Sequence, residues 1–198
     1  FRAGLLGAVL LFSTVLQAQT TREETYADLN KLDGVYYAYP VDSSVNTPAP
    51  KGFKPFYISH YGRHGSRYLI SDNDYINVLG PLRKAHEAGK LTPVGEDVLT
   101  LAEAVWAEAE GRGGDLTPLG VRQQKGIGRR MYKAYPEVFT DGAQMSARAT
   151  TVMRVALSMD ALCEALKEEN PKLDITRESS NRYMNYLNYH APESNAYT

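Results

Sequence analysis

The residues of this sequence with the clearest chemical potential are Arg63, His64 and Arg67, which follow directly on an apolar run. Guanidinium groups match the oxygens of a phosphate group and stay charged at every relevant pH. Gly65 lets the main chain come close to a ligand. An imidazole between two arginines is harder to protonate, which favours its neutral, nucleophilic form. A nucleophile beside a phosphate clamp is the minimum for phosphoryl transfer through a phosphohistidine.

The alternative interpretation is a solvated loop whose charges only face water. The preceding residues, 53–61, form a short apolar and β-branched run, which predicts a buried strand. Ligands of parallel sheets collect at the carboxyl ends of the strands, which is where Arg63 begins. This placement favours the functional interpretation.

The elements expected downstream are helices and short strands. Residues 73–90 are helical but interrupted near Gly80-Pro81, which predicts two pieces or a kink. Thr-Pro pairs open two further helices, over 92–111 and 116–136. Apolar residues at helical spacing predict a helix over 149–169. Residues 144–150 and 172–176 are expected to be short strands. This order predicts an α/β fold with a largely parallel sheet.

The first residues, 1–18, have the pattern of a secretory signal peptide. Arg2 supplies the charge, residues 5–15 the apolar stretch, and residues 16–18 a cleavage site. The alternative, a membrane anchor, would need a longer apolar run. We therefore expect export to the periplasm, the cell surface or the medium, with no stable membrane span after cleavage. The chain begins with Phe, so we expect the natural start to lie upstream. Residues 19–52 are expected to be an arm or linker.

Composition excludes several kinds of partner and site. The formal net charge is −1, which argues against a general nucleic-acid binder. Cys163 is the single cysteine, so no internal disulfide can form, and its place on an apolar helix face predicts a buried, inert thiol. Four histidines without a Cys/His cluster suggest no metal site. We expect no cofactor.

The stretch from Arg63 to Arg67 resembles the R-H-G-x-R signature of the histidine phosphatases, in the branch that contains acid phosphatases and phytases. The run "APKGFKPFYISHYGRHGSRYL", with "GVYYAYP" before it and "LTPLGVRQQKGIGRRM" after it, is most similar to bacterial multiple inositol polyphosphate phosphatases. The resemblance covers about residues 34–170. It implies a phosphoglycerate-mutase-like α/β fold, with a mostly parallel sheet flanked by helices, a helical insert, and residues 53–198 as the N-terminal part of the domain. The fold would be incomplete in this chain.

The resemblance also implies roles for individual residues. His64 would be the nucleophile, and Arg63 and Arg67 would hold the phosphate. Arg148 matches a later phosphate-binding arginine of the family, and as a cation at a helix start it would be disfavoured by the helix dipole. Arg154 is interpreted as a solvated helix residue.

The general acid that the family needs, a histidine closely followed by an acidic residue, is unknown here. We expect it beyond Thr198, because His190 and Glu193 have the wrong spacing. Without that acid the chain alone is expected to be inactive.

The leading hypothesis is a metal-independent phosphomonoester hydrolase acting on inositol polyphosphates such as phytate. A general acid phosphatase or phosphosugar phosphatase is one alternative. A catalytically incomplete phosphate-binding module is another. Tyr183, Tyr186 and Tyr189 recur every three residues and predict either a packing stripe or an insert over the mouth of the active site.

Overall fold

The computed structural model describes residues 22–32, 34, 37 and 47–187. The predicted signal peptide, most of the 34–40 run, and the segment with Tyr189, His190 and Glu193 lie outside this range. The chain divides into two compact units, Phe1–Val41 and Asp42–Thr198. The first contains the short helix α2 (Arg22–Ala27) and the 3-10 helix η1 (Leu29–Leu32). The second contains every other element of the described residues.

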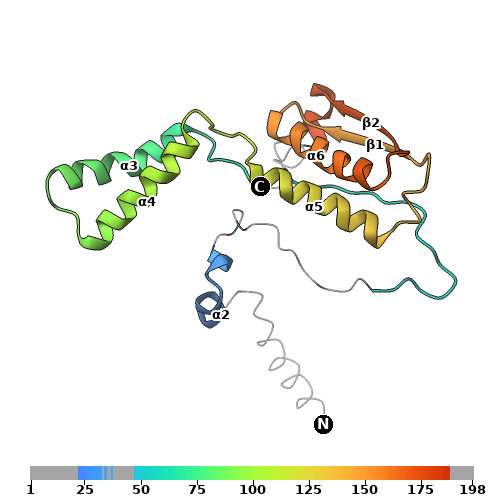
Figure 1. Cartoon of the computed structure of the whole chain (residues 1–198), viewed down its shortest axis with the longest axis horizontal. Helices are drawn as coiled ribbons and strands as arrows, with labels where there is room; N and C mark the ends of the chain where they lie inside the picture. The colour runs from blue at the N-terminus through green and yellow to red at the C-terminus, as the bar shows by residue number, and fades with distance from the viewer. Residues whose placement is uncertain (1–21, 33, 35–36, 38–46, 188–198) are drawn as a thin grey trace, which may run out of the picture. The chain divides into compact units, whose positions relative to one another are not determined.

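The centre of the second unit is a β-α-β motif, shown in Figure 1. Strands β1 (Gln144–Ala149) and β2 (Asp174–Ser179) are parallel, with Gln144 opposite Asp174, and helix α6 (Met153–Glu169) connects them. Helix α5 (Pro118–Ala134) packs against α6. The predicted α/β class is confirmed as a mixed fold with a small parallel sheet, consistent with part of a phosphoglycerate-mutase-like domain.

The core of this motif is apolar and small. Its buried centre consists of Phe139, Leu162, Leu166 and Leu173, against which side chains of α5 and β1 pack. On the surface, Lys125 of α5 forms ion pairs with Glu164 and Glu168 of α6. Burial of apolar surface stabilises a fold by about 25 cal/mol for each Å² removed from water. Exposed ion pairs stabilise it by only about 0–1 kcal/mol each. The core, rather than the ion pairs, therefore holds α5 on α6.

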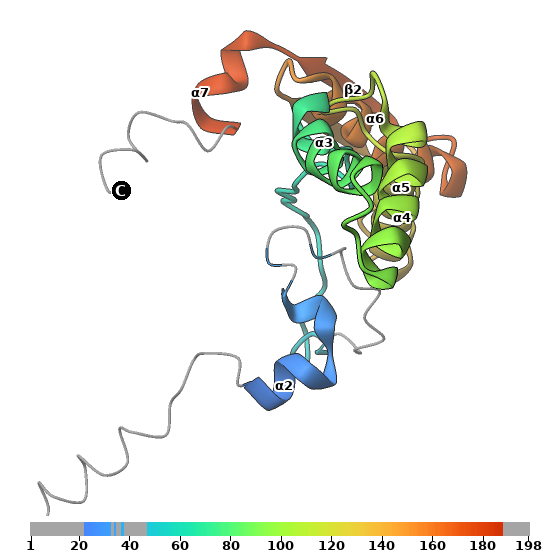
Figure 2. The same cartoon turned by 90° about the vertical axis from the view of Figure 1, so that its left-hand side faces the viewer.

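Helices α3 (Asp72–Glu87) and α4 (Pro93–Ala109) form a hairpin, seen side by side in Figures 1 and 2. Ser71 and Asp74 cap the start of α3 reciprocally, and Thr92 caps α4. Of the two outcomes predicted near Gly80-Pro81, two separate pieces is wrong, because α3 is one helix with Pro81 inside it, while the kink stays a prediction. Pro81 lies on the exposed side. Water can therefore satisfy the carbonyl that has lost its helical N–H partner.

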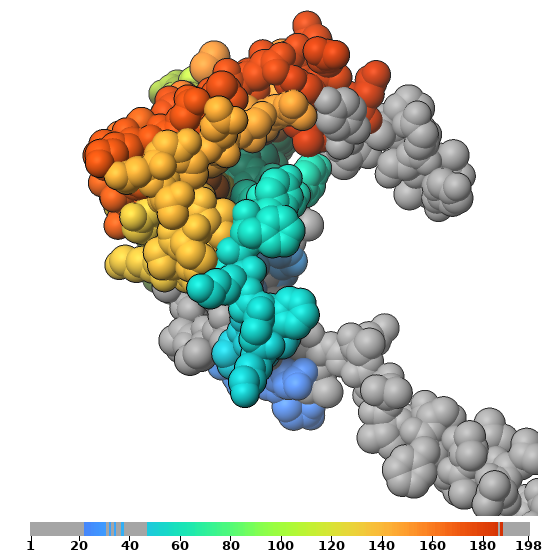
Figure 3. Space-filling model, turned by 90° about the vertical axis from the view of Figure 1, so that its right-hand side faces the viewer, coloured from blue at the N-terminus to red at the C-terminus, as the bar shows by residue number. Residues whose placement is uncertain are grey.

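The segment 53–61, predicted as a buried strand, is extended but pairs with no strand in the described part of the chain. Phe56 is 91% exposed, and Tyr57 and Tyr61 are also exposed, whereas Ile58 packs against the core. Figure 3 shows the segment in cyan along the surface of the second unit. The apolar pattern thus identified an extended segment, but the prediction that it is buried was wrong.

The described chain ends with the 3-10 helix η3 (Asn181–Tyr183) and helix α7 (Met184–Leu187), visible in Figure 2. Tyr183 is buried. The side chains of Tyr186 and Tyr189 lie outside the described part, so the two interpretations of the tyrosine pattern stay open. No helix among the described residues is long and apolar enough to span a bilayer.

Cys163 should be unreactive while the chain is folded. Its side chain is 0% exposed, and burial raises the pKa of its thiol, so the reactive thiolate is scarce. We expect a thiol reagent such as Ellman's reagent to modify Cys163 rapidly only in denaturant. Equal rates with and without denaturant would contradict the buried position.

Candidate active site

The loop Arg63–Arg67 is fixed to the start of α5. Thr117 caps this helix through its side chain, which accepts a hydrogen bond from the N–H of Gly120. The same residue donates twice to the carbonyl of Ser66, from its N–H at 2.9 Å and from Oγ1 at 2.8 Å. The predicted Thr-Pro helix start therefore also anchors the loop.

Two glycines allow this close approach. A Cβ on Gly65 would lie 2.6 Å from the Cα of Gly120, and a Cβ on Gly120 would lie 2.9 Å from the N of Ser66. Both distances are below any normal carbon contact. Gly65 is therefore required by the packing of the loop against α5.

Replacing Gly120 with alanine should destabilise the chain by about 1–3 kcal/mol, the usual cost of overpacking a tight contact. The matched control is Gly126→Ala in the same helix, where the added Cβ meets only the flexible end of Arg130. That variant should be neutral or gain up to about 1 kcal/mol from helix propensity. Urea unfolding of both variants measures the difference. Equal stabilities would contradict the close contact between loop and helix.

Three further polar side chains hold the main chain around His64. The amide of Gln124, which is 6% exposed, donates from Nε2 to the carbonyl of Arg63 at 2.9 Å. Ser158 of α6 accepts from the N–H of Gly65 at 3.1 Å. The Oε1 of Gln123 accepts from the N–H of Ser66 at 2.8 Å. The loop is thus tied to both α5 and α6.

His64 has the geometry of a neutral nucleophile. Its Nδ1 lies 2.8 Å from the carbonyl oxygen of Gly65. Since a carbonyl only accepts, Nδ1 carries the proton and Nε2 keeps its lone pair. The pKa of His64 is lowered, mainly by burial, and further by the charges of Arg154, Arg63 and Arg67, while the Gly65 hydrogen bond opposes the shift. The lowered pKa therefore favours the neutral imidazole over the imidazolium.

Arg154 is the residue that the sequence interpretation missed. It is half-buried rather than solvated, donates to the carbonyl of Gly114 at 3.4 Å, and is the first of the arginines that lower the pKa of His64. The helix begins at Met153, not at residue 149, so Arg154 occupies its first turn. The dipole argument that was applied to Arg148 therefore belongs to Arg154.

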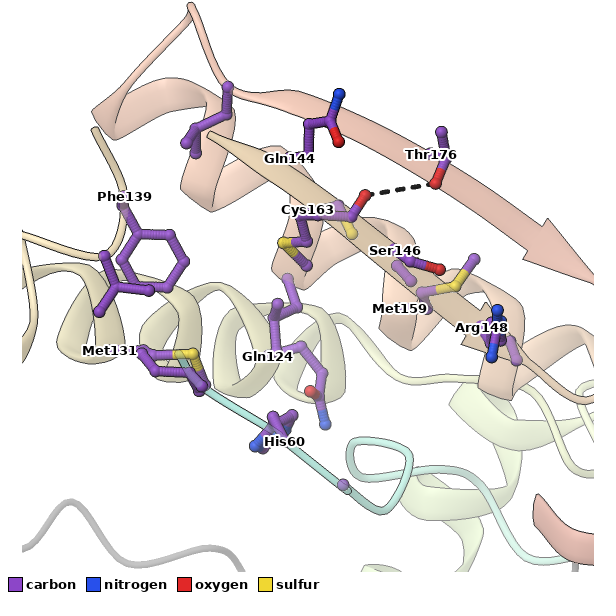
Figure 4. A pocket seen from close by; sticks show the side chains of 18 of the residues that line it. His60, Gln124, Met131, Phe139, Gln144, Ser146, Arg148, Met159, Cys163 and Thr176 are labelled. Atoms are coloured by element: carbon purple, nitrogen blue, oxygen red, sulfur yellow. Dashed lines mark hydrogen bonds between the residues drawn. The ribbon is translucent and has the colours of Figure 1, made fainter. Parts of the chain in front are cut away.

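Arg148 lies in β1, before the helix, and lines the same cavity as Arg63 and His64. Its guanidinium lies over the ring of the buried Tyr183, 5.5 Å from the centroid. The hydroxyl of Tyr183 donates to Glu178, the residue opposite Arg148 in β2. Arg148 is thus held at the carboxyl end of the sheet, as Figure 4 shows.

The cavity has a volume of about 780 Å³ and lies between the extended segment, β1, α5 and α6. Arg63, His64 and Arg148 contribute cationic or basic groups, while Met131, Phe139 and Leu162 contribute apolar surface. Asp174 also lines the cavity. It lies opposite Gln144, four residues before Arg148 in β1, and is therefore about 13 Å from Arg148 along the strands. Among the described residues, no cluster of three or more His, Cys, Asp or Glu could hold a metal ion.

Comparisons with known proteins found similarity among solved structures. No family model matches the sequence, and no curated protein matches it. Among solved structures, the chain is similar to the multiple inositol polyphosphate phosphatase of Bifidobacterium longum, solved in complex with inositol hexasulfate, with 25% identity and a TM-score of 0.50. The match covers 70% of this chain and 30% of that chain. The chain thus spans less than a third of its neighbour, and the similarity that its Arg63–Arg67 signature predicted, to a histidine phosphatase, is confirmed.

Proposed function

We propose that the Arg63–Arg67 loop is the phosphate site of a histidine-type phosphomonoesterase and that His64 is its nucleophile. The observation that carries the proposal is the state of His64, whose Nδ1 is bound to the Gly65 carbonyl and whose pKa is lowered beside three guanidiniums. Arg63, Arg67 and Arg154 would neutralise the charge on the transferring phosphoryl group. Arg148 would bind a further oxygen or a second phosphate of the substrate.

The reaction would proceed in two displacements. The lone pair of Nε2 forms a bond to phosphorus while the ester P–O bond breaks, and the leaving oxygen takes a proton from a general acid. Water then attacks the phosphorus of the phosphohistidine and gives a proton to the deprotonated general acid, while the P–N bond breaks, inorganic phosphate leaves and Nε2 regains its lone pair. His64 serves only as nucleophile in this scheme, because its proton stays on Nδ1, hydrogen-bonded to the Gly65 carbonyl.

The identity of the general acid stays open. In the described part of the chain, Asp174 is the carboxylate that lines the cavity, and it lies toward the opposite end of the strands from Arg148. This favours keeping the second hypothesis, a phosphate-binding module that lacks the acid. A substrate with a good leaving group separates the two, since it needs no protonation to depart.

For the substrate we propose inositol polyphosphates. The neighbouring enzyme is named for them, and its complex contains inositol hexasulfate, a polyanion with a sulfate on each ring carbon. Arginines at two places on the cavity wall, in the loop and in β1, suit a ligand with several anionic groups. A phosphosugar or a simple phosphomonoester would use only the first of these places.

The test is covalent labelling with an aryl phosphate whose phosphoryl group is radioactive and whose phenolate leaves without help. After acid-free denaturation, the protein should retain a label that is stable in alkali and lost in acid, as a phosphoramidate is. A label with the opposite stability would rule out the phosphohistidine. Binding of inositol hexakisphosphate without any label would favour the binding module.

A further inference from the structure

We propose that Gln123 is a positioning residue that fixes the side chain of His64 in the tautomer with its proton on Nδ1. The inference rests on the proposed function only for its consequence in phosphoryl transfer. Two hydrogen bonds carry it: Ser66 N–H donates to Oε1 of Gln123 at 2.8 Å, and Nδ1 of His64 donates to the Gly65 carbonyl at 2.8 Å.

Both bonds belong to one rigid group. The Gly65 carbonyl and the Ser66 N–H are the two ends of a single peptide unit, which is planar, and none of the described peptide bonds is cis. In a trans unit the C=O and the N–H point in opposite directions. Gln123 on one side and His64 on the other therefore bind the same planar peptide unit. A rotation of this unit that breaks one of the two hydrogen bonds also breaks the other.

This peptide needs such a restraint because of Gly65. The contact with Gly120 leaves no room for a Cβ at this position, so the site must use glycine. Glycine, however, offers the least resistance to rotation of its neighbouring peptide units. Gln123 compensates for that freedom. Acceptance of the Ser66 proton by Oε1 also polarises the peptide, which makes the Gly65 carbonyl a stronger acceptor for Nδ1.

The other polar contacts do not perform this task. Gln124 binds the carbonyl of Arg63, and Ser158 binds the N–H of Gly65, so both act on the peptide units before the one that contacts the imidazole. Among these contacts, that of Gln123 alone lies on the peptide unit whose carbonyl accepts the hydrogen bond from Nδ1 of His64. Fixing the proton there leaves the lone pair on Nε2, where a phosphoryl group can be attacked.

The test uses the full chain with isotope-labelled histidine, in which heteronuclear NMR at alkaline pH reports which ring nitrogen carries the proton. The His64 signal is assigned by its loss in His64→Gln. In the parent chain we expect the Nδ1–H form. In Gln123→Leu we expect a mixture with the Nε2–H form, and a fall of about 10–100-fold in phosphorylation by an aryl phosphate, the usual effect of losing an outer-shell orienting group.

Two further variants serve as controls for this experiment. Asn77→Leu, a comparable loss of an exposed amide on α3, should change neither tautomer nor rate. Gln123→Glu keeps an acceptor oxygen and should keep the Nδ1–H form even if the leucine variant fails to fold. Its charge, set against those of Arg154, Arg63 and Arg67 around His64, should move the imidazole titration to higher pH.

The outcomes are separable from those of the proposed function. An unchanged tautomer in Gln123→Leu, or an Nε2–H form or an unmoved titration in Gln123→Glu, would overturn the role of Gln123 even if phosphohistidine forms. Absence of phosphohistidine in the parent chain would instead defeat the proposed function, while the NMR result still decides the role of Gln123.

Discussion

Replacing His64 with alanine should abolish covalent labelling by the aryl phosphate, with a loss of about 10⁴-fold or more, as expected for removal of a nucleophile. Binding of inorganic phosphate should change little, because the guanidiniums of Arg63, Arg67 and Arg154 remain and the lost imidazole is neutral. Acid-labile radioactivity measures the first quantity and titration calorimetry the second.

The matched control is His86→Ala, since His86 is exposed on α3 and pairs with Glu96 away from the loop. It should label like the parent chain. Free imidazole added to His64→Ala should enter the vacated space and restore transfer of the phosphoryl group, now to imidazole or water. Label that survives in His64→Ala would show that another residue is the nucleophile.

The elements with local signals were the ones that the sequence predicted well. The helix starts at Thr92-Pro93 and Thr117-Pro118 are confirmed, because capping and a fixed proline φ depend on adjacent residues alone. The strand predicted over 144–150 is confirmed as β1, which contains Arg148. The exposure of residues 53–61 could not be predicted from their sequence. The apolar content of a segment shows that it is able to pack against other elements, but not which elements lie close enough to bury it.

The contacts around the site lie beyond local patterns. Gln124 binds the carbonyl of Arg63, and Ser158 binds the N–H of Gly65, in each case across a long stretch of sequence. The helical pattern identifies Gln124 and Ser158 only as polar residues of a helix. The error over Arg154 has a more specific cause. Three residues that could belong to strand, turn or helix, Thr150 to Val152, separate β1 from α6, and placing the helix start four residues early applied the dipole argument to Arg148 instead of Arg154.

Removal of Arg154 should change both the rate of labelling and the pKa of His64. Arg154→Ala should lower the rate of labelling about 10²–10³-fold, the typical effect of losing one preorganised donor to transition-state charge. It should also raise the pKa of His64, because a nearby cation disfavours the imidazolium. Since the neutral imidazole is the proposed nucleophile, the acid-side limb of the pH–rate profile should move to higher pH.

Two variants separate charge from geometry. Arg154→Lys retains the positive charge, so the acid-side limb should stay near its position in the parent chain, while phosphate affinity falls because the planar fork is lost. Arg83→Ala removes an exposed arginine that pairs with Glu103 on the α3–α4 hairpin and should leave both quantities unchanged. An unmoved limb in Arg154→Ala would mean that its charge does not act on His64. A fall in rate without that shift would then assign Arg154 to phosphate binding alone.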